Sequence, residues 1–415
     1  MDTVSRVDLD ALALLIGAEG QELLGALPPY DPAGELALQT RLRDAGYDPV
    51  LVSAALTQSR LRARAAAKFG DFASGMLFTP EGLEQATRFE LAARHAARFL
   101  RAEVRLVHDL GCGIGADAMA FAGLGLGVRA VDADAVTAVV AGYNLRHWPD
   151  AQVAHARAED AELEASTRHT GVWVDPARRE PGVADAAGRA RRIFSLEAIS
   201  PSWPHVQAWA VQLPATGAKL SPALHHGAVP PGAEAQWTSW HGEVLECAVW
   251  WGPLVDTVGR TAAVCRPGAP AVVLTEADAW DAPPPVGRIQ DVRAYLYEAD
   301  RAVIRAGLTG ALTRLVDGAE LDGDAGGVGY VTSARAVDVP WAQRYAVRAA
   351  MPWHVKAVRA WLRDHDAGRL TIKKRGVPLD PELVRKQLRV RGSDEATLVL
   401  TRVAGHPHVL VVEPT

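Results

Sequence analysis

The sequence predicts an α/β protein with a Rossmann-like, mostly parallel sheet. Three observations support this prediction. Helical periodicity dominates residues 1–100, strand and helix patterns alternate from 101 to about 280, and a small α+β pattern occupies the last 75 residues. Alternating strands and helices are typical of parallel sheets covered by helices on their faces. We therefore expect an N-terminal helical region at 1–100, a central domain at 101–338 and a C-terminal domain at 339–415.

The first hundred residues contain three amphipathic stretches, at 9–27, 51–69 and 79–100. The third begins with Thr79-Pro80-Glu81, which combines a capping hydroxyl, a proline at the first helical position and an acid in the first turn. The spacing of three or four residues between apolar side chains predicts one buried face for this helix, made of Ala86, Phe89, Ala93, Ala97 and Leu100.

The segment VHDLGCGIGADAMAFA, residues 107–122, combines a strand, a glycine-rich turn and a helix start. Such an element binds nucleotides, because Gly111 and Gly113 let the backbone approach a ligand closely. A dinucleotide fingerprint reads GxGxxG and holds a pyrophosphate. Here the pattern is DxGxGxG, and the leading Asp109 suits a ligand that carries a positive charge and no phosphate. We therefore predict S-adenosylmethionine (SAM) as cofactor, with its amino group on Asp109.

Acidic residues follow four successive predicted strands, as expected where ligands meet the carboxyl ends of a parallel sheet. Asp132 lies 23 residues after Asp109, which is close to the spacing of an acid that binds ribose hydroxyls. Asp160 is predicted to contact the adenine amino group, although it could also cap a turn. Asp175 ends the fourth strand and is predicted to face the methyl acceptor; a strand cap or an ion pair is the alternative.

The net charge of −5 conceals a basic segment. Residues 341–391 contain 13 Lys and Arg against 4 Asp and Glu, a balance of +9. Such a segment suggests a polyanionic partner, nucleic acid first, whereas a solvated basic face is the alternative. The three cysteines have no zinc-binding spacing and no apolar run is long enough to span a membrane, so we expect no metal, no membrane and a cytoplasmic protein.

Five segments of the chain carry a family resemblance. They are KFG with MLFTPEGLEQATR (68–88), HDLGCGIGADAMAFA (108–122), VWVDPARR (172–179), YLYEADRAVIRAGL (295–308) and IKKRGVPLDPELVRKQL (372–388). On these segments the chain resembles bacterial class I SAM-dependent methyltransferases with a C-terminal THUMP-like domain. The resemblance implies a seven-stranded methyltransferase sheet and, through the THUMP-like domain, an RNA substrate.

The motif after the fourth strand departs from the pattern of nucleic-acid amino methyltransferases. Those enzymes usually continue Asp-Pro with a second proline and an aromatic residue, which stacks on a flipped base. Here Asp175-Pro176 match, but Ala177 and Arg178 take the next two places. We predict Asp175 and Pro176 as catalytic residues, and we predict a phosphate contact for Arg178 and Arg179.

The complete prediction is a SAM-dependent methyltransferase that methylates a base nitrogen of rRNA or tRNA. The alternatives are a methyltransferase of a small molecule or a protein, and a non-catalytic protein that binds SAM and RNA. The predicted cofactor site comprises Thr79, Asp109, Gly111, Gly113, Asp132 and Asp160. The predicted substrate contacts are Arg178, Arg179, Lys373, Lys374 and Arg375.

Overall fold

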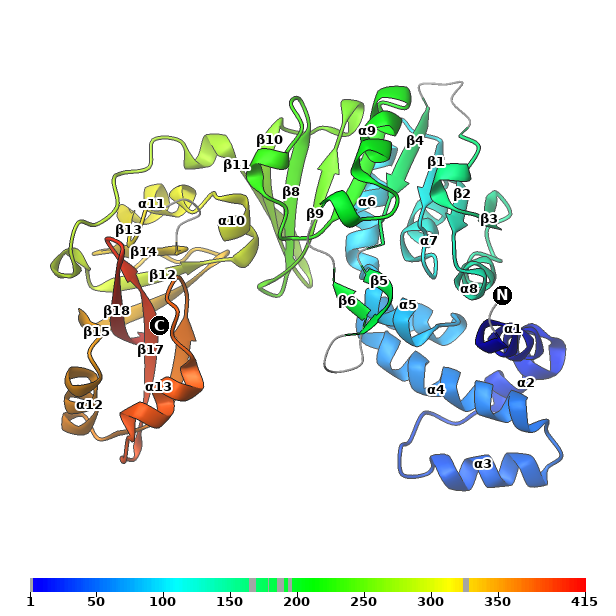
Figure 1. Cartoon of the computed structure of the whole chain (residues 1–415), viewed down its shortest axis with the longest axis horizontal. Coiled ribbons are helices and arrows are strands. Elements are labelled where there is room, and N and C mark those ends of the chain that lie inside the picture. Colours follow the sequence, from blue (N-terminus) through cyan, green and yellow to red (C-terminus); the bar gives the residue numbers. More distant parts are fainter. Residues whose placement is uncertain (1–2, 164–168, 178, 185–189, 193–195, 324–327) are drawn as a thin grey trace. The chain divides into compact units, whose positions relative to one another are not determined.

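The computed structural model describes residues 3–163, 169–177, 179–184, 190–192, 196–323 and 328–415 (Figure 1). The chain divides into two compact units. The first comprises residues 1–219 with 250–255, and the second comprises 220–249 with 256–415. These units differ from the three predicted domains, whose boundaries remain a prediction.

The N-terminal region is helical, as the sequence predicts. Asp48 caps the longest helix by accepting hydrogen bonds from two backbone N–H groups of its first turn. The single helix expected over 79–100 is in fact two helices, separated at residues 86–88. The helices are α1 (Thr3–Ile16), α2 (Ala18–Ala26), α3 (Glu35–Asp44), α4 (Pro49–Phe69), α5 (Pro80–Gln85) and α6 (Phe89–Arg101).

The prediction of which residues form the buried face of α6 is wrong. Ala93 is exposed and Leu100 is 47% exposed in α6. Four of the five predicted residues lie within α6, where the alanine pairs 92–93 and 96–97 fit either of two adjacent faces, so the apolar periodicity did not decide between these faces. The buried side chains are instead Leu91, Ala92, His95, Ala96, Arg98 and Phe99.

One sheet has nine strands in the order β3-β2-β1-β4-β7-β9-β8-β10-β11, two more than the seven expected. The pairs of β1 with β2, β1 with β4, β2 with β3 and β4 with β7 are parallel, which confirms the Rossmann-like fold class. The strands are β1 (Leu106–Leu110), β2 (Gly127–Asp132), β3 (Ala151–His155), β4 (Thr170–Val174), β7 (Ala215–Leu220), β8 (Glu234–Trp240), β9 (Glu243–Trp250), β10 (Gly259–Arg266) and β11 (Ala269–Thr275).

Helices cover both faces of the parallel strands, because successive strand residues point to opposite sides. Val172 and Val174 of β4 belong to a core with α9 (Trp203–Gln212). Trp173, between them, stacks on Trp250 and packs edge-on against Phe121 of α7 (Ala116–Gly123). Helix α8 (Ala135–Asn144) packs on β2 and β3, and β5 (Arg179–Ala184) pairs with β6 (Ala190–Arg192).

The second unit contains a seven-stranded sheet of order β13-β14-β12-β15-β18-β17-β16. Its strands are β12 (Tyr295–Ala299), β13 (Gly318–Glu320), β14 (Tyr330–Ser333), β15 (Ala342–Pro352), β16 (Ala367–Lys374), β17 (Asp394–Val403) and β18 (His406–Pro414). Its helices are α10 (Arg301–Ala306), α11 (Gly310–Val316), α12 (Val355–Asp364) and α13 (Pro381–Leu388). The core under α12 and α13 includes Val358, Leu362, Val384 and Leu388.

This second sheet curls. Lys373 of the edge strand β16 donates a hydrogen bond of 2.6 Å to Glu298 of β12, although three strands separate β12 from β16 in the sheet order. Arg375 donates to the same carboxylate at 3.2 Å. The charged pairs therefore connect two strands that lie apart in the ladder.

Short 3₁₀ turns complete the fold. They are η1 (Gly70–Gly75), η2 (Ala158–Asp160), η3 (Leu196–Ala198), η4 (His226–Ala228), η5 (Gly252–Leu254), η6 (Glu276–Ala279) and η7 (Ile289–Asp291). Within the described part of the chain, no helix is both long and apolar enough to cross a membrane. The same residues contain no group of three or more His, Cys, Asp or Glu side chains that could hold a metal ion.

Candidate functional site

A cavity of about 970 Å³ lies at the carboxyl ends of the parallel strands in the first unit. Its volume is at the upper end of the range for ligand pockets, about 300–1,000 Å³. Its acidic lining residues are Glu81, Asp117, Asp132, Asp134, Glu159 and Asp175, and its basic one among the described residues is Arg157. The cavity therefore favours neutral or cationic ligand groups over phosphates.

The glycine-rich turn after β1 forms part of the cavity wall. Gly111 and Gly113 have φ angles of +85° and +56°, which side chains rarely adopt. A Cβ on Gly111 would lie 2.8 Å from the carbonyl oxygen of Asp175, so the close approach of two strand ends requires glycine. A Cβ on Gly113 would have no neighbour within 4 Å, and it would project into open space beside the cavity.

Asp132 lies at the end of β2 and fixes this turn. Its Oδ2 accepts a hydrogen bond of 2.9 Å from the Gly113 N–H, and its Oδ1 accepts one of 2.9 Å from the Asp134 N–H. Burial raises the pKa of Asp132 despite these two bonds. Asp134 caps α8 by accepting from the Thr137 N–H at 2.8 Å, so the two acids have different local roles.

Asp109 is a buried carboxylate whose two oxygens have no hydrogen-bond partner among the described residues. Burial raises the pKa of Asp109 well above the ordinary aspartate value, and the nearby carboxylates Asp117 and Asp175 raise it further. An unpaired buried carboxylate is costly, so its presence beside the glycine turn indicates a site for a cationic ligand group.

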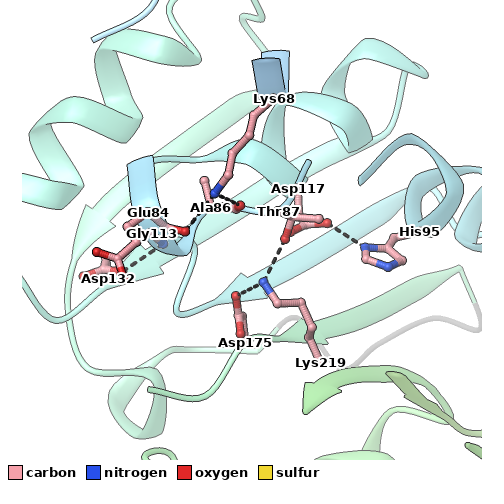
Figure 2. Close-up of polar contacts among 10 residues, drawn as sticks. All are labelled: Lys68, Glu84, Ala86, Thr87, His95, Gly113, Asp117, Asp132, Asp175 and Lys219. Atoms are coloured by element: carbon pink, nitrogen blue, oxygen red, sulfur yellow. Dashed lines mark hydrogen bonds and ion pairs between the residues drawn. The ribbon is translucent and has the colours of Figure 1, made fainter. Parts of the chain in front are cut away.

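Lys219, at the end of β7, joins Asp175 to a chain of buried polar groups (Figure 2). Its Nζ donates to Asp175 Oδ2 at 2.5 Å and to Thr87 Oγ1 at 2.8 Å. Thr87 donates to Asp117 Oδ2 at 2.7 Å, and His95 Nδ1 lies 2.8 Å from Asp117 Oδ1. Burial opposes ionisation of Asp117, but the hydrogen bond with His95, the charges of His95 and Lys219, and the Thr87 hydroxyl together outweigh burial and lower the pKa of Asp117.

Two buried amides hold the segment before α5 against the glycine turn. Gln58 of α4 bonds to both the N–H and the C=O of Phe78, at 3.0 and 2.8 Å. Asn144 of α8 does the same for Leu77, at 2.8 and 3.0 Å, and also donates to the Ile114 carbonyl at 2.9 Å. The two amide side chains bond to the backbone of residues 77 and 78 as a neighbouring strand would. They thereby position Thr79 on the cavity wall.

Thr79 lines the cavity, but its side chain already caps α5. Its Oγ1 accepts a hydrogen bond of 2.9 Å from the Gly82 N–H. At the other end of α5, Lys68 Nζ donates to the carbonyls of Leu83, Glu84 and Ala86 at 2.7, 2.8 and 3.0 Å (Figure 2). A lysine in this place stabilises the carboxyl end of a helix.

The remaining predicted residues of the first unit have distinct positions. Pro176 lines the cavity with Asp175, whereas the turn after β3 contributes Arg157, Ala158 and Glu159, and Asp160 is exposed outside the lining. Ala177 exchanges two backbone hydrogen bonds with Ser200, of 2.7 and 3.3 Å, which hold the loop after β4. The predictions for Arg178 and for the Arg179 side chain lie outside the described residues.

The three cations predicted to contact substrate in the second unit differ in whether an acid already pairs with them. Lys373 and Arg375 share Glu298, whose side chain is 17% exposed, so both are occupied by a structural ion pair. Lys374 is exposed, and no described acid pairs with it. The structure thus favours Lys374 over its two neighbours as a contact for an external anion.

The sequence comparisons decide the family. Two family models match, "THUMP domain-like" over residues 342–414 and a domain of unknown function over residues 8–65. Over 357 residues the chain is 30% identical to an uncharacterized S-adenosylmethionine-dependent methyltransferase of Mycobacterium tuberculosis, found in strains CDC 1551 and H37Rv. The match covers 83% of this chain and 90% of the relative. The chain belongs to the S-adenosylmethionine-dependent methyltransferases.

A solved structure supports the fold of this methyltransferase. The crystal structure of a candidate methyltransferase from Porphyromonas gingivalis W83 superposes with a TM-score of 0.69 at 19% sequence identity. The alignment covers 94% of this chain and all of the other. The family resemblance drawn from the sequence motifs, the α/β fold class and SAM as cofactor are thereby confirmed.

The residues of this methyltransferase fit SAM. Asp109 is not among the cavity-lining residues, but it lies two residues before Gly111, which lines the cavity, and its carboxylate has no hydrogen-bond partner among the described residues. It therefore suits the ammonium of the methionine half. The open side of Gly113 leaves room for the ligand. Asp132 lines the same cavity and has carboxylate lone pairs left after its two backbone bonds. The sequence analysis missed Thr87, His95 and Lys219; the last could have been suspected, since it is a charge inside the short apolar strand ATGAKL.

Proposed function

We propose that this methyltransferase transfers the methyl group of SAM to a nitrogen of an RNA base. The observation that carries the proposal is Asp175, a carboxylate at the end of β4 that lines the cavity and is held by Lys219. Its side chain is 26% exposed, and the Lys219 contact uses Oδ2. The Oδ1 atom is then available to accept an N–H of an amino group and orient its nitrogen.

SAM supplies a methyl group on a positively charged sulfur. Asp175 orients the acceptor nitrogen for in-line attack and accepts the proton that the methylated nitrogen releases. Lys219 fixes the carboxylate, so the acceptor needs little reorganisation to reach the reactive geometry. Pro176, Ala177 and Pro201 line the cavity as the apolar surface near this acid.

The charge distribution supports an RNA acceptor of which only a base enters the cavity. The cavity lining is acidic, so a phosphate is disfavoured there. Residues 341–391, which overlap the THUMP-like match, have a balance of +9, part of which is offset by pairs with acids outside the segment, such as Glu298. The exposed cations, among them Lys374, Lys386 and Arg389, can bind the phosphate backbone. A flipped base fits both the acidic cavity and the basic segment. The base is neutral and can enter the cavity, whereas its phosphates stay outside, where basic side chains can bind them.

The test is transfer of a tritiated methyl group from SAM to total RNA from a strain that lacks the gene. We expect incorporation into that RNA and little into RNA from the parent strain, whose sites are already methylated. Asp175→Asn should keep SAM binding and lose at least about ten-fold in transfer, because the amide no longer accepts the proton. Nuclease digestion and chromatography then identify the base.

A small-molecule amine is the second candidate, favoured by the excess of acids around the cavity. An amine carries a positive charge that such a cavity attracts. Transfer to an amine fraction of a cell extract, with none to RNA, would replace the first proposal by this one. SAM binding without transfer to either would indicate a non-catalytic protein.

A further inference from the structure

The cavity has a second wall that carries no charge. Helices α1 and α4 supply this wall, which we call the helical cover. Its lining residues are Ala11, Leu12, Leu15, Pro49, Val50, Ser53, Ala54, Thr57 and Gln58. The acids described above come from other elements, so the cavity has one acidic side and one apolar side with a few hydroxyl groups.

The helical cover is fixed to the rest of the first unit. The Gln21 side chain of α2 donates to the Leu15 carbonyl at 2.7 Å, and the hydroxyl of Tyr143 on α8 donates to Gln21 Oε1 at 2.5 Å. Helix α1 accordingly packs on α8 (Figure 1). Gln58 anchors α4 through the backbone of Phe78.

The helical cover and the first turn of α8 line the same cavity, whereas the Tyr143 anchor lies in the last turn of that helix. The first turn contributes Asp134, Val136 and Thr137, which follow Asp132 in the chain. Asp132 is the acid predicted to bind the ribose, so this part of the cavity suits the adenosine half of SAM. The uncharged cover is suited to a flat ring with apolar faces and polar edges, as adenine has.

Val50 is the residue of the cover that most clearly indicates a contact with a bound ligand. Its side chain is apolar, lines the cavity and is 47% exposed. Burial of such a side chain against an apolar ligand surface stabilises the complex. We propose that α1 and α4 cover the adenosine half of bound SAM, which gives the region matched only as a domain of unknown function a role in cofactor binding.

The test is calorimetric titration of the full chain with SAM and with 5′-methylthioadenosine, which keeps the adenosine half and lacks the amino acid. Val50→Ser removes apolar contact and should weaken both ligands by about five-fold. Ser53→Trp fills the cavity from an exposed position and should weaken both by more than about ten-fold. Val211→Ser, at an 85% exposed position on α9 outside the lining, should change neither.

A second variant separates the two halves of the ligand. Asp109→Asn should weaken SAM and leave 5′-methylthioadenosine unchanged, because only SAM carries the ammonium. Wild-type affinity of Val50→Ser and Ser53→Trp for both ligands would overturn the proposal. Because Val50 is 47% exposed, Val50→Ser disturbs little of the core, and it decides the matter even where the tryptophan disturbs folding. These measurements require no acceptor, so they are independent of the RNA proposal.

Discussion

Lys219 Nζ and Asp175 Oδ2 are 2.5 Å apart, and the Lys219 side chain is only 4% exposed. The pair joins the ends of β4 and β7, two neighbouring parallel strands. Through Thr87, the same ammonium reaches the Asp117–His95 pair. One buried cation thus organises Asp175 and, through Thr87, a second carboxylate that lines the cavity.

The first prediction concerns this cation. Lys219→Met should lower the free energy of unfolding by about 2–4 kcal/mol, because it leaves Asp175 and the Thr87 hydroxyl without their donor. Methyl transfer should fall by at least about ten-fold, with a larger change in kcat than in KM for SAM. Lys219→Arg keeps the charge and should recover part of the transfer. Urea unfolding and initial-rate kinetics measure the two effects; equal rates for both variants would contradict a positioning role for the charge.

The second prediction concerns Asp109 and pH. Its pKa in the folded protein is raised, so the folded state holds the proton more tightly than the unfolded state. Stability should therefore fall as pH rises from about 4, the ordinary aspartate pKa, toward the raised value. Asp109→Asn should remove this slope, and its stability advantage over the wild type should grow with pH. Denaturant unfolding between pH 4 and pH 8 measures it.

The same substitution should weaken SAM by about ten-fold or more, because a charge-assisted hydrogen bond contributes about 1.5–3 kcal/mol. Since the ammonium binds the ionised carboxylate, SAM binding to the wild type should release protons. The binding enthalpy should then depend on the ionisation enthalpy of the buffer, and this dependence should disappear in Asp109→Asn. Wild-type SAM affinity in the variant would show that the ammonium binds elsewhere.

The third prediction concerns salt and RNA, and it depends on the proposed RNA substrate. Lys374, Lys386 and Arg389 are exposed, and no described acid pairs with them. Reversing all three to Glu should reduce the slope of log affinity against log salt by about 0.7–0.9 for each phosphate that the protein no longer neutralises. SAM affinity should not change.

A double variant of the paired cations, Lys373→Met with Arg375→Met, is the control. It should leave most of the salt slope and instead lower stability, because Glu298 loses both partners. A salt titration of RNA binding and thermal unfolding separate the two effects. A larger decrease of the slope in this control than in the triple variant would assign phosphate binding to the paired cations after all.

Patterns that depend on neighbours in sequence predicted much of this molecule. Asp109 and Asp132 lie at the ends of parallel strands, as the alternation of strands and helices predicted. His95 was missed because the sequence prediction placed Ala93 and Ala97, rather than Ala92 and Ala96, on the buried face of its helix. His95 lies on that buried face, and the break at 86–88 places Thr87 in the polar chain.

Such patterns cannot predict interactions between residues that are far apart in the sequence. Glu298 lies 75 and 77 residues from Lys373 and Arg375, so a count of basic residues treats as free two cations that the fold pairs with one acid. Lys219 and Thr87 are 132 residues apart. Only the paired strands and their helices bring these groups to hydrogen-bond distance.

The curl of the second sheet bears on how this protein can be dissected. The THUMP-like match begins at residue 342, but Glu298 and the rest of β12 precede it. A recombinant fragment that starts at residue 339 would lack β12, one of the two strands that pair with β15, and Lys373 and Arg375 would lose their shared acid. Such a fragment would present two cations that are paired with an acid in the whole protein, so its affinity for nucleic acid would overstate that of the intact enzyme.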